Sequence, residues 1–254
     1  MTNAVRVLTL VLCFCLAAIS VEADAVTELR TVLSRFRATE SLKATVEIIR
    51  SRHSKGRFLN DEFEGSASAD VEAGPEGMRA SFSRPSLDRA ADEDAAHQFD
   101  SHRRHGTFNA MAEMLPATLS SLLDAGATLL RLVERSHVIE QRNGVDHGRK
   151  VRLLTLDLPP SGSGSDAGEV VFHEDHLTIA VGPDGVPISA ERIRKGSAGL
   201  LFIHVDSVRT QAWSFAVRGD HLLAVRFENS SVVSGPGQHG DARSVWTVRL
   251  PGMP

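Results

Sequence analysis

The chain has 254 residues, of which 42% are hydrophobic, and a formal net charge of −4 at pH 7. A chain of this length can bury a sizeable core. Its mildly acidic, mixed charge lacks the clustered Lys and Arg of nucleic-acid-binding surfaces, so we expect no nucleic-acid partner.

The first two dozen residues are typical of a secretory signal peptide. Arg6 precedes an apolar run over Val7 to Ile19, and Val21-Glu22-Ala23 provides a cleavage site. The run has about 13 residues, which is too short for the roughly 20 that a membrane-spanning helix needs. We expect residues 1–23 to be removed after Ala23, giving a periplasmic or secreted product without a transmembrane segment.

Both cysteines, Cys13 and Cys15, lie inside that apolar run, so the mature chain would contain none. Neither follows the small-residue pattern of a lipoprotein processing site, which favours a soluble product. A mature chain of about 230 residues can do without disulfides in an oxidising compartment, because its core is large enough. The net charge stays near −4 after cleavage, because Arg6 and Glu22 are removed together.

An amphipathic helix is expected at 25–38, followed by a strand at 42–49, because the apolar period changes there from 3.6 to 2. Strict alternation over 62–73 predicts a half-solvated antiparallel strand. A turn at 74–77 leads into a third strand at 78–82. The inward face of the second strand carries small residues, which indicates a close neighbour, either the N-terminal helix or a ligand. Close packing of protein interiors favours the helix.

Residues 85–107 lose periodicity and predict a long surface loop. A helical region is expected at 111–123, where Pro116 either kinks one helix or starts a second, and Gly126 would end it. Together these segments predict a long loop or helical insertion at about 86–130.

From residue 138 onward the chain is expected to be almost all strand and turn. Turn signals such as Asn143-Gly144 and Lys195-Gly196 recur at roughly 10-residue spacing, which predicts antiparallel hairpins. We expect one β-rich domain over 24–254. Its later strands would lie at 138–142, 151–158, 177–181, 188–192, 200–205, 213–217, 222–227 and 245–250.

This order of elements resembles the LolA/LolB/RseB superfamily of periplasmic lipoprotein carriers and sensors. Three stretches carry the resemblance. The helix through Leu29, Leu33 and Phe36 leads directly into the first strand and the hairpin after it. Leu177 to Arg192 looks like the family's strand, Asp-Gly turn and returning strand, and Trp213 to Phe227 looks like a closing hairpin.

The resemblance implies an α+β, mainly β fold, in which a curved antiparallel sheet forms an incomplete barrel around the N-terminal helix and further short helices. It also implies an apolar concave face for acyl chains or a peptide, where each buried CH₂ contributes about 0.8 kcal/mol. Such a site needs no catalytic group and no cofactor. The expected lining consists of Phe63, Ala67, Ala69, Val71, Met111, Met114, Leu115 and Trp213.

These residues also have a plainer interpretation. Trp213 lies in an expected strand, where tryptophan more often belongs to the core. Met111 and Met114 form a stripe that is more often a packing face, although an apolar helix there would also serve as a lid. The chain departs from the carriers in its long 86–110 segment and in lacking a lipidated cysteine, which puts an outer-membrane acceptor role in doubt.

Eleven histidines raise the alternative of a metal site. Two pairs, His102 with His105 and His173 with His176, have a spacing that brings side chains together on a helix but separates them on a strand. The second pair would meet only if Glu174-Asp175 formed a tight turn, and arginines within the first pair repel a cation. We therefore expect no metal.

No serine lies in a nucleophile-elbow setting, and no phosphate-binding glycine loop or dinucleotide fingerprint occurs. We expect a non-enzymatic carrier or sensor of lipid or lipoprotein in the bacterial envelope. The alternatives are an envelope structural domain with a protein partner and a secreted hydrolase. A carrier should contain an apolar cavity, an interaction protein an exposed apolar patch, and a hydrolase a cleft with carboxylates or histidines.

Overall fold

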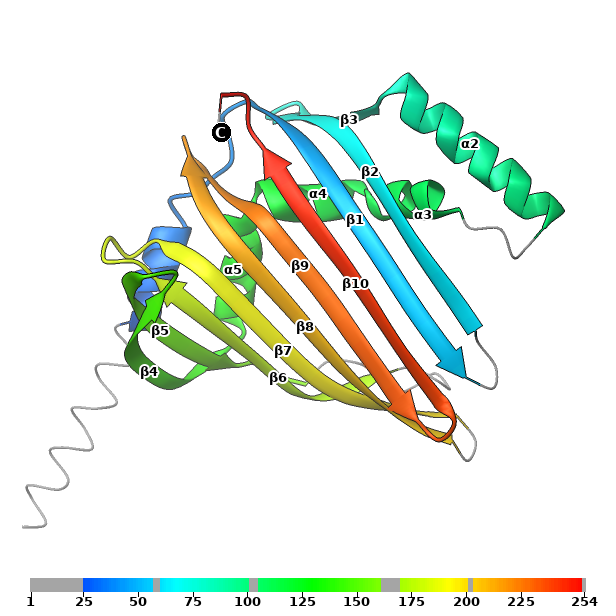
Figure 1. Cartoon of the computed structure of the whole chain (residues 1–254). Coiled ribbons are helices and arrows are strands. Elements are labelled where there is room, and N and C mark those ends of the chain that lie inside the picture. The colour runs from blue at the N-terminus through cyan, green and yellow to red at the C-terminus, as the bar shows by residue number, and fades with distance from the viewer. Residues whose placement is uncertain (1–24, 57–59, 101–104, 161–169, 201–202, 253–254) are drawn as a thin grey trace, which may run out of the picture.

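The computed structural model describes residues 25–56, 60–100, 105–160, 170–200 and 203–252, so the expected signal peptide lies outside the described residues. Its strands form one antiparallel sheet in the order β3-β2-β1-β10-β9-β8-β7-β6-β5-β4 (Figure 1). The sheet is curved and is not closed, since β3 and β4 are its two edges. The expected α+β, mainly β class and the antiparallel sheet are confirmed.

Most strands are longer than the sequence indicated. Consecutive strands pair with one another except β3 and β4, and β1 pairs in addition with β10. Their bounds are β1 Leu42–Gly56, β2 Asn60–Gly74, β3 Gly77–Phe82, β4 His137–Asp146, β5 Arg149–Asp157, β6 Val171–Val181, β7 Pro187–Leu200, β8 Ile203–Arg218, β9 His221–Gly235 and β10 Gln238–Arg249.

Two expected turns are wrong, because the strands run through them. Asn143-Gly144 lies within β4, and the chain turns later at His147 and Gly148, which both have positive φ. Lys195-Gly196 lies within β7. A Cβ at Gly196 would lie closer than 3.0 Å to the carbonyl oxygen of Val171, so this glycine permits close approach of β6 at a bulge. The expected strand at 200–205 begins at the last residue of β7 and ends inside β8. The expected strand at 213–217 lies in β8 as well, so one long strand holds most of both.

The helices are formed by the N-terminal and middle parts of the chain. The N-terminal helix is described over 25–33, five residues shorter at its end than the expected 25–38. The others are α2 Arg84–Phe99, α3 Gly106–Glu113, α4 Pro116–Leu123 and α5 Ala125–Glu134. Pro116 starts a second short helix and does not kink a single long one, which were the two expected alternatives. Among the described residues, no helix is both long and apolar enough to cross a membrane.

The expected surface loop at 85–107 is wrong for most of its length, because 84–99 forms α2. The Ser83 hydroxyl caps this helix by accepting from the Ser86 N–H, and a proline occupies its first turn. Only Ala90 is buried, so the helix has no apolar stripe. The Glu93 carboxylate ties α2 to α3 by accepting from Thr107 N and Thr107 Oγ1, both at 2.7 Å.

Gly126 lies in the first turn of α5 and does not end a helix, contrary to expectation. The Asp124 carboxylate caps this helix by accepting from Ala127 N at 3.1 Å. A Cβ at Gly126 would lie 2.9 Å from the Cβ of Phe36, so glycine lets α5 approach the segment after the N-terminal helix.

Two buried clusters form the core on one face of the sheet. The N-terminal helix and α5 cover β5, β6 and β7, where Leu29, Leu33 and Leu129 pack with leucines of the sheet. Helix α3 packs against β1 and β2, and α4 packs against β9 and β3. Their buried residues share one cluster with those of β1, β2, β9 and β10. The small residues of β2 therefore face α3 and not the N-terminal helix, which corrects that expectation. Gly65 and Gly106 bring the two backbones into direct contact.

The segment between the N-terminal helix and β1 is held by Asp220, just before β9. Its carboxylate accepts from Thr39 Oγ1 at 2.6 Å, Thr39 N at 2.7 Å and Glu40 N at 3.2 Å. These hydrogen bonds, that of the Thr39 hydroxyl first, lower the pKa of Asp220 to about 2. Buried His221 adds Nε2 at 2.8 Å from the Glu40 carbonyl oxygen, so the segment is fixed on both sides.

Candidate functional site

The concave face of the sheet changes character along its strands. In β1 the inward side chains are apolar up to Ile48 and then become Arg50, Arg52 and Ser54, since alternate residues share a face. The described helices pack against the first part, which we call the proximal half, and α3 also contacts Gly65, the register partner of Arg50. The part from Arg50 onward, and its neighbours in register, we call the distal half.

A row of aromatic side chains marks the boundary between the two halves. Trp246 is opposite Ile48, Phe227 is opposite Trp246, and Trp213 is opposite Phe227. The rings of Trp213 and Phe227 stack at 5.2 Å between centroids. On its strand, each of these residues is the last member of the cluster under α3 and α4, so apolar packing ends here.

Two rows of residues cross the distal half from β1 towards β6. Register places each residue opposite the next, and the rows lie side by side on the inward face. The first row contains Arg50, Ser244, Asn229, Gln211 and Arg192. The second row contains Arg52, Ala242, Ser231, Arg209, Arg194 and Asp175.

Carboxylates pair with only some of these arginines. Asp175 is 1% exposed and accepts from Arg192 Nε at 2.7 Å and Nη2 at 2.5 Å. Arg50 lies 3.1 Å from Glu113 at the end of α3. Within the described part of the chain, Arg52 and Arg209 form no ion pair. Among the residues whose side chains are described, the inward face of the distal half therefore carries more arginines than carboxylates.

Arg194 is the most constrained of the group. It stands directly opposite Arg209, and its guanidinium carbon lies 4.6 Å from the ring centroid of Phe172. Burial lowers the pKa of Arg194 to about 10, with further lowering by Arg192 and Arg209 that Asp175 partly offsets. Among the described residues its buried Nε has no hydrogen-bond partner, and neither does the Asn229 Oδ1.

A hollow of about 190 Å³ opens beside Arg52. Its lining consists of Arg50 and other residues of β1, together with Ser231 of β9 and Ala242 of β10. Ser231 and Ala242 are small and separate Arg52 from Arg209 across the sheet. The hollow therefore lies where long arginine side chains can reach over small neighbours.

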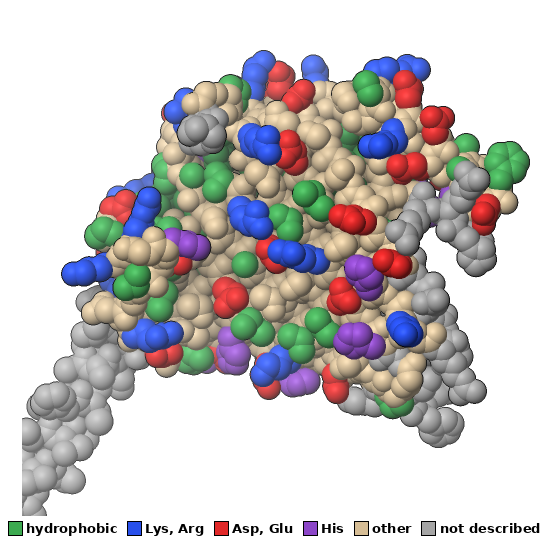
Figure 2. All heavy atoms as spheres, in the orientation of Figure 1, with side chains coloured by type: hydrophobic (Ala, Val, Ile, Leu, Met, Phe, Trp, Pro, Cys, Tyr) green, Lys and Arg blue, Asp and Glu red, His purple; other side chains and the backbone are tan. Residues whose placement is uncertain are grey.

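The other face of the sheet has a different charge pattern. Figure 2 shows basic and acidic side chains interspersed over that face, without a large area of one sign. Many are cross-strand ion pairs, such as Arg249 with Glu47 and Arg243 with Glu228, at 2.9 and 2.8 Å. Paired charges of this kind are ordinary solvated surface.

The structure places most expected lining residues in the proximal half. Ala67, Ala69, Val71 and Met114 are buried in the cluster under α3 and α4, and Met111 and Trp213 pack against it. Two lie apart from that cluster: Phe63 is buried 4.9 Å from the Arg50 guanidinium carbon, and Leu115 is 58% exposed. Their role as a ligand lining stays a prediction. The arginines of the distal half were not expected.

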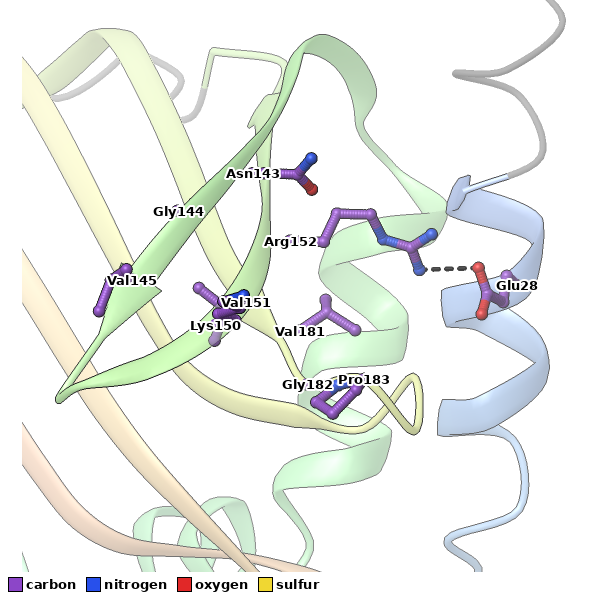
Figure 3. A pocket seen from close by; sticks show the side chains of 10 residues that line it. All are labelled: Glu28, Asn143, Gly144, Val145, Lys150, Val151, Arg152, Val181, Gly182 and Pro183. Carbon is purple, nitrogen blue, oxygen red and sulfur yellow. Dashed lines mark hydrogen bonds and ion pairs between the residues drawn. The ribbon is translucent and has the colours of Figure 1, made fainter.

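A larger cleft of about 720 Å³ lies between the β4–β5 hairpin and the N-terminal helix (Figure 3). Arg152 of β5 donates to Glu28 of the N-terminal helix at 2.7 Å at its rim. Val145, Val151 and Val181 line it, with Gly182 and Pro183. None of the expected lining residues takes part.

The histidine pairs do not form a metal site in the described structure. β6 continues through Glu174-Asp175, so the turn that would bring His173 and His176 together does not form. His176 lies 3.1 Å from Asp157 instead. His105 has its ring 3.9 Å from that of His97, and His102 lies outside the described residues. Across the described ranges, no group of three or more His, Cys, Asp or Glu could hold a metal ion.

Known proteins offer a distant structural likeness to this chain. No protein-family model and no curated protein matches the sequence. Among solved structures, a DUF1329 family protein from Desulfovibrio piger is similar, with 10% identity, coverage of 92% of this chain and 95% of that one, and a TM-score of 0.32. This distant likeness supports no functional argument, and the LolA/LolB/RseB resemblance remains a prediction from the sequence.

Proposed function

We propose that the chain is a non-enzymatic binding protein of the bacterial envelope that carries or senses a lipid or lipoprotein on the concave face of its sheet. One observation carries the proposal. Along β8, β9 and β10, an apolar half is followed by the aromatic row Trp213, Phe227 and Trp246. Beyond that row the inward face is polar, with arginines contributed by β1, β7 and β8. That order matches an amphiphile, whose apolar chain and polar head need adjacent surfaces of unlike character.

The helix arrangement supports the same proposal. The N-terminal helix belongs to the buried cluster that includes β5, β6 and β7, and the cluster over β1, β2 and β10 contains none of its residues, so it does not fill the whole concave face. Helices α3 and α4 cover the rest of the proximal half through separate short segments. Met111 and Met114 lie at this interface, and methionine adapts readily to a changed apolar neighbour. An acyl chain would enter beneath these helices.

Native mass spectrometry of the mature protein, purified from its own envelope fraction, tests the proposal. We expect a bound acyl lipid at near one per chain, identified after organic extraction. Ser231→Trp should lower the occupancy because the new ring fills the distal hollow, whereas Ser230→Trp, one residue away on the opposite face, should not. An apo mass for the wild-type chain after gentle handling would instead favour a protein-binding role.

A further inference from the structure

Arg194 and Arg209 face one another, and among the described residues neither forms an ion pair with a carboxylate, which is unusual in a β-sheet. Arg194 and Arg209 are directly opposite across β7 and β8, and like charges in that arrangement destabilise a sheet. Arg192 is engaged by Asp175, so the nearest carboxylate is already occupied. The N–H groups of the two guanidinium groups are therefore available to an acceptor. The repulsion between the two positive charges destabilises the sheet, and a bound anion would remove that cost.

The setting of the pair is suited to binding an anion. Phe172 supports the face of the Arg194 guanidinium, which leaves the edge with its N–H groups free to point elsewhere. Opposing strands are about 5 Å apart, so the two guanidinium groups can converge on one oxyanion. Arg52 stands three strands from Arg209, roughly 14 Å away at the backbone, and can approach from the other side of the hollow.

We infer that the distal half of the concave face binds a phosphate-type oxyanion, clamped by Arg194 and Arg209 with Arg52 as a third donor. This inference rests on the proposed function and deepens it, since the oxyanion would be the head group of the bound amphiphile. Planar guanidinium groups bind phosphate oxygens in pairs, which makes arginine the suitable residue here. The Ser231 hydroxyl lies between the arginines and can donate to the same group.

The unpartnered Asn229 Oδ1 adds a second requirement on the ligand. An amide oxygen accepts hydrogen bonds, so it would bind a hydroxyl next to the phosphate. Asn229 is two residues from Ser231 on the same face of β9, within one head-group width of the clamp. A phosphoglycerol head group contains both an oxyanion and hydroxyls.

The test compares soluble short-chain lipids by titration calorimetry on the full mature chain. Dioctanoyl phosphatidylglycerol should bind at least about tenfold more tightly than dioctanoylglycerol, which has the same acyl chains and no phosphate, because one charge-assisted hydrogen bond contributes about that factor. Arg194→Gln with Arg209→Gln should abolish the difference. Arg79→Gln with Arg149→Gln, at two exposed positions, makes the same change in net charge and should preserve it.

Each outcome separates the anion clamp from the wider proposal. Equal binding of both lipids, unchanged by Arg194→Gln with Arg209→Gln, would overturn the clamp and leave lipid binding standing. Binding of neither lipid would overturn lipid binding itself. Inorganic phosphate, bound as tightly as phosphatidylglycerol and lost in the same variant, would support the clamp with a soluble anion as its source. If the variant does not fold, salt provides the second measurement: wild-type affinity for phosphatidylglycerol should fall with ionic strength and that for dioctanoylglycerol should not.

Discussion

Gly65→Ala is expected to destabilise the protein by about 3 kcal/mol, measured as the free energy of unfolding in denaturant. A Cβ at this position would lie closer than 3.0 Å to the carbonyl oxygen, carbonyl carbon and Cα of Gly106. All three atoms belong to the backbone of α3, so no side chain can rotate away, and overpacking of this kind costs at the upper end of the usual range. Helix α3 must shift from β2 to relieve the clash.

Gly199→Ala is the matched control for that substitution. It lies in β7, lacks a positive φ, and a Cβ there would meet nothing within 4 Å. The change should leave the protein as stable as the wild type or slightly more so, because alanine restricts the unfolded chain. Unfolding of the Gly65→Ala protein at the wild-type midpoint would show that α3 is not docked on β2 as described.

Asp175→Asn is expected to cost about 3 to 5 kcal/mol of stability, because it leaves a largely buried arginine without its counter-charge. The Asp175 side chain is fully buried and that of Arg192 is 15% exposed. Loss of the carboxylate would also remove the attraction of Asp175 that partly offsets the lowering of the Arg194 pKa. Thermal and denaturant unfolding measure the effect.

The neighbouring residue provides the control. Glu174 lies one position along β6, faces the opposite side and pairs with Lys195 at 2.8 Å on the exposed surface. Glu174→Gln should leave the unfolding midpoint nearly unchanged, because exposed ion pairs contribute little. Equal losses from Asp175→Asn and Glu174→Gln would contradict the assignment of Asp175 as the buried partner of Arg192.

The apolar parts of the fold could be predicted because burial of one face spaces apolar residues at a regular interval along the sequence. The strict alternation of β2 appears directly in the structure, and its small inward residues correctly indicated a close neighbour. Residue size does not say which element approaches, however, so the choice of the N-terminal helix over α3 was wrong. Helix α2 was missed because only Ala90 is buried and its stability depends on a cap and on Glu93.

The distal half was missed for a related reason. Strands were expected to end where their apolar alternation ends, and β1 and β7 continue past that point with inward arginines and glycine. The spacing of two in Arg50 and Arg52, and again in Arg192 and Arg194, was the available signal, since it keeps the side chains on one face. Their meeting across β8 and β9 depends on register, which no local pattern specifies.

Cysteine protection tests the location of the ligand most directly, and the expected mature chain offers a cysteine-free background for it. Ser231→Cys would place a thiol in the distal hollow, and Ser230→Cys would place one on the opposite face of β9. We predict that dioctanoyl phosphatidylglycerol slows alkylation of the first variant and leaves the second unchanged. Alkylation of both variants at rates that the lipid does not alter would contradict binding at the concave face.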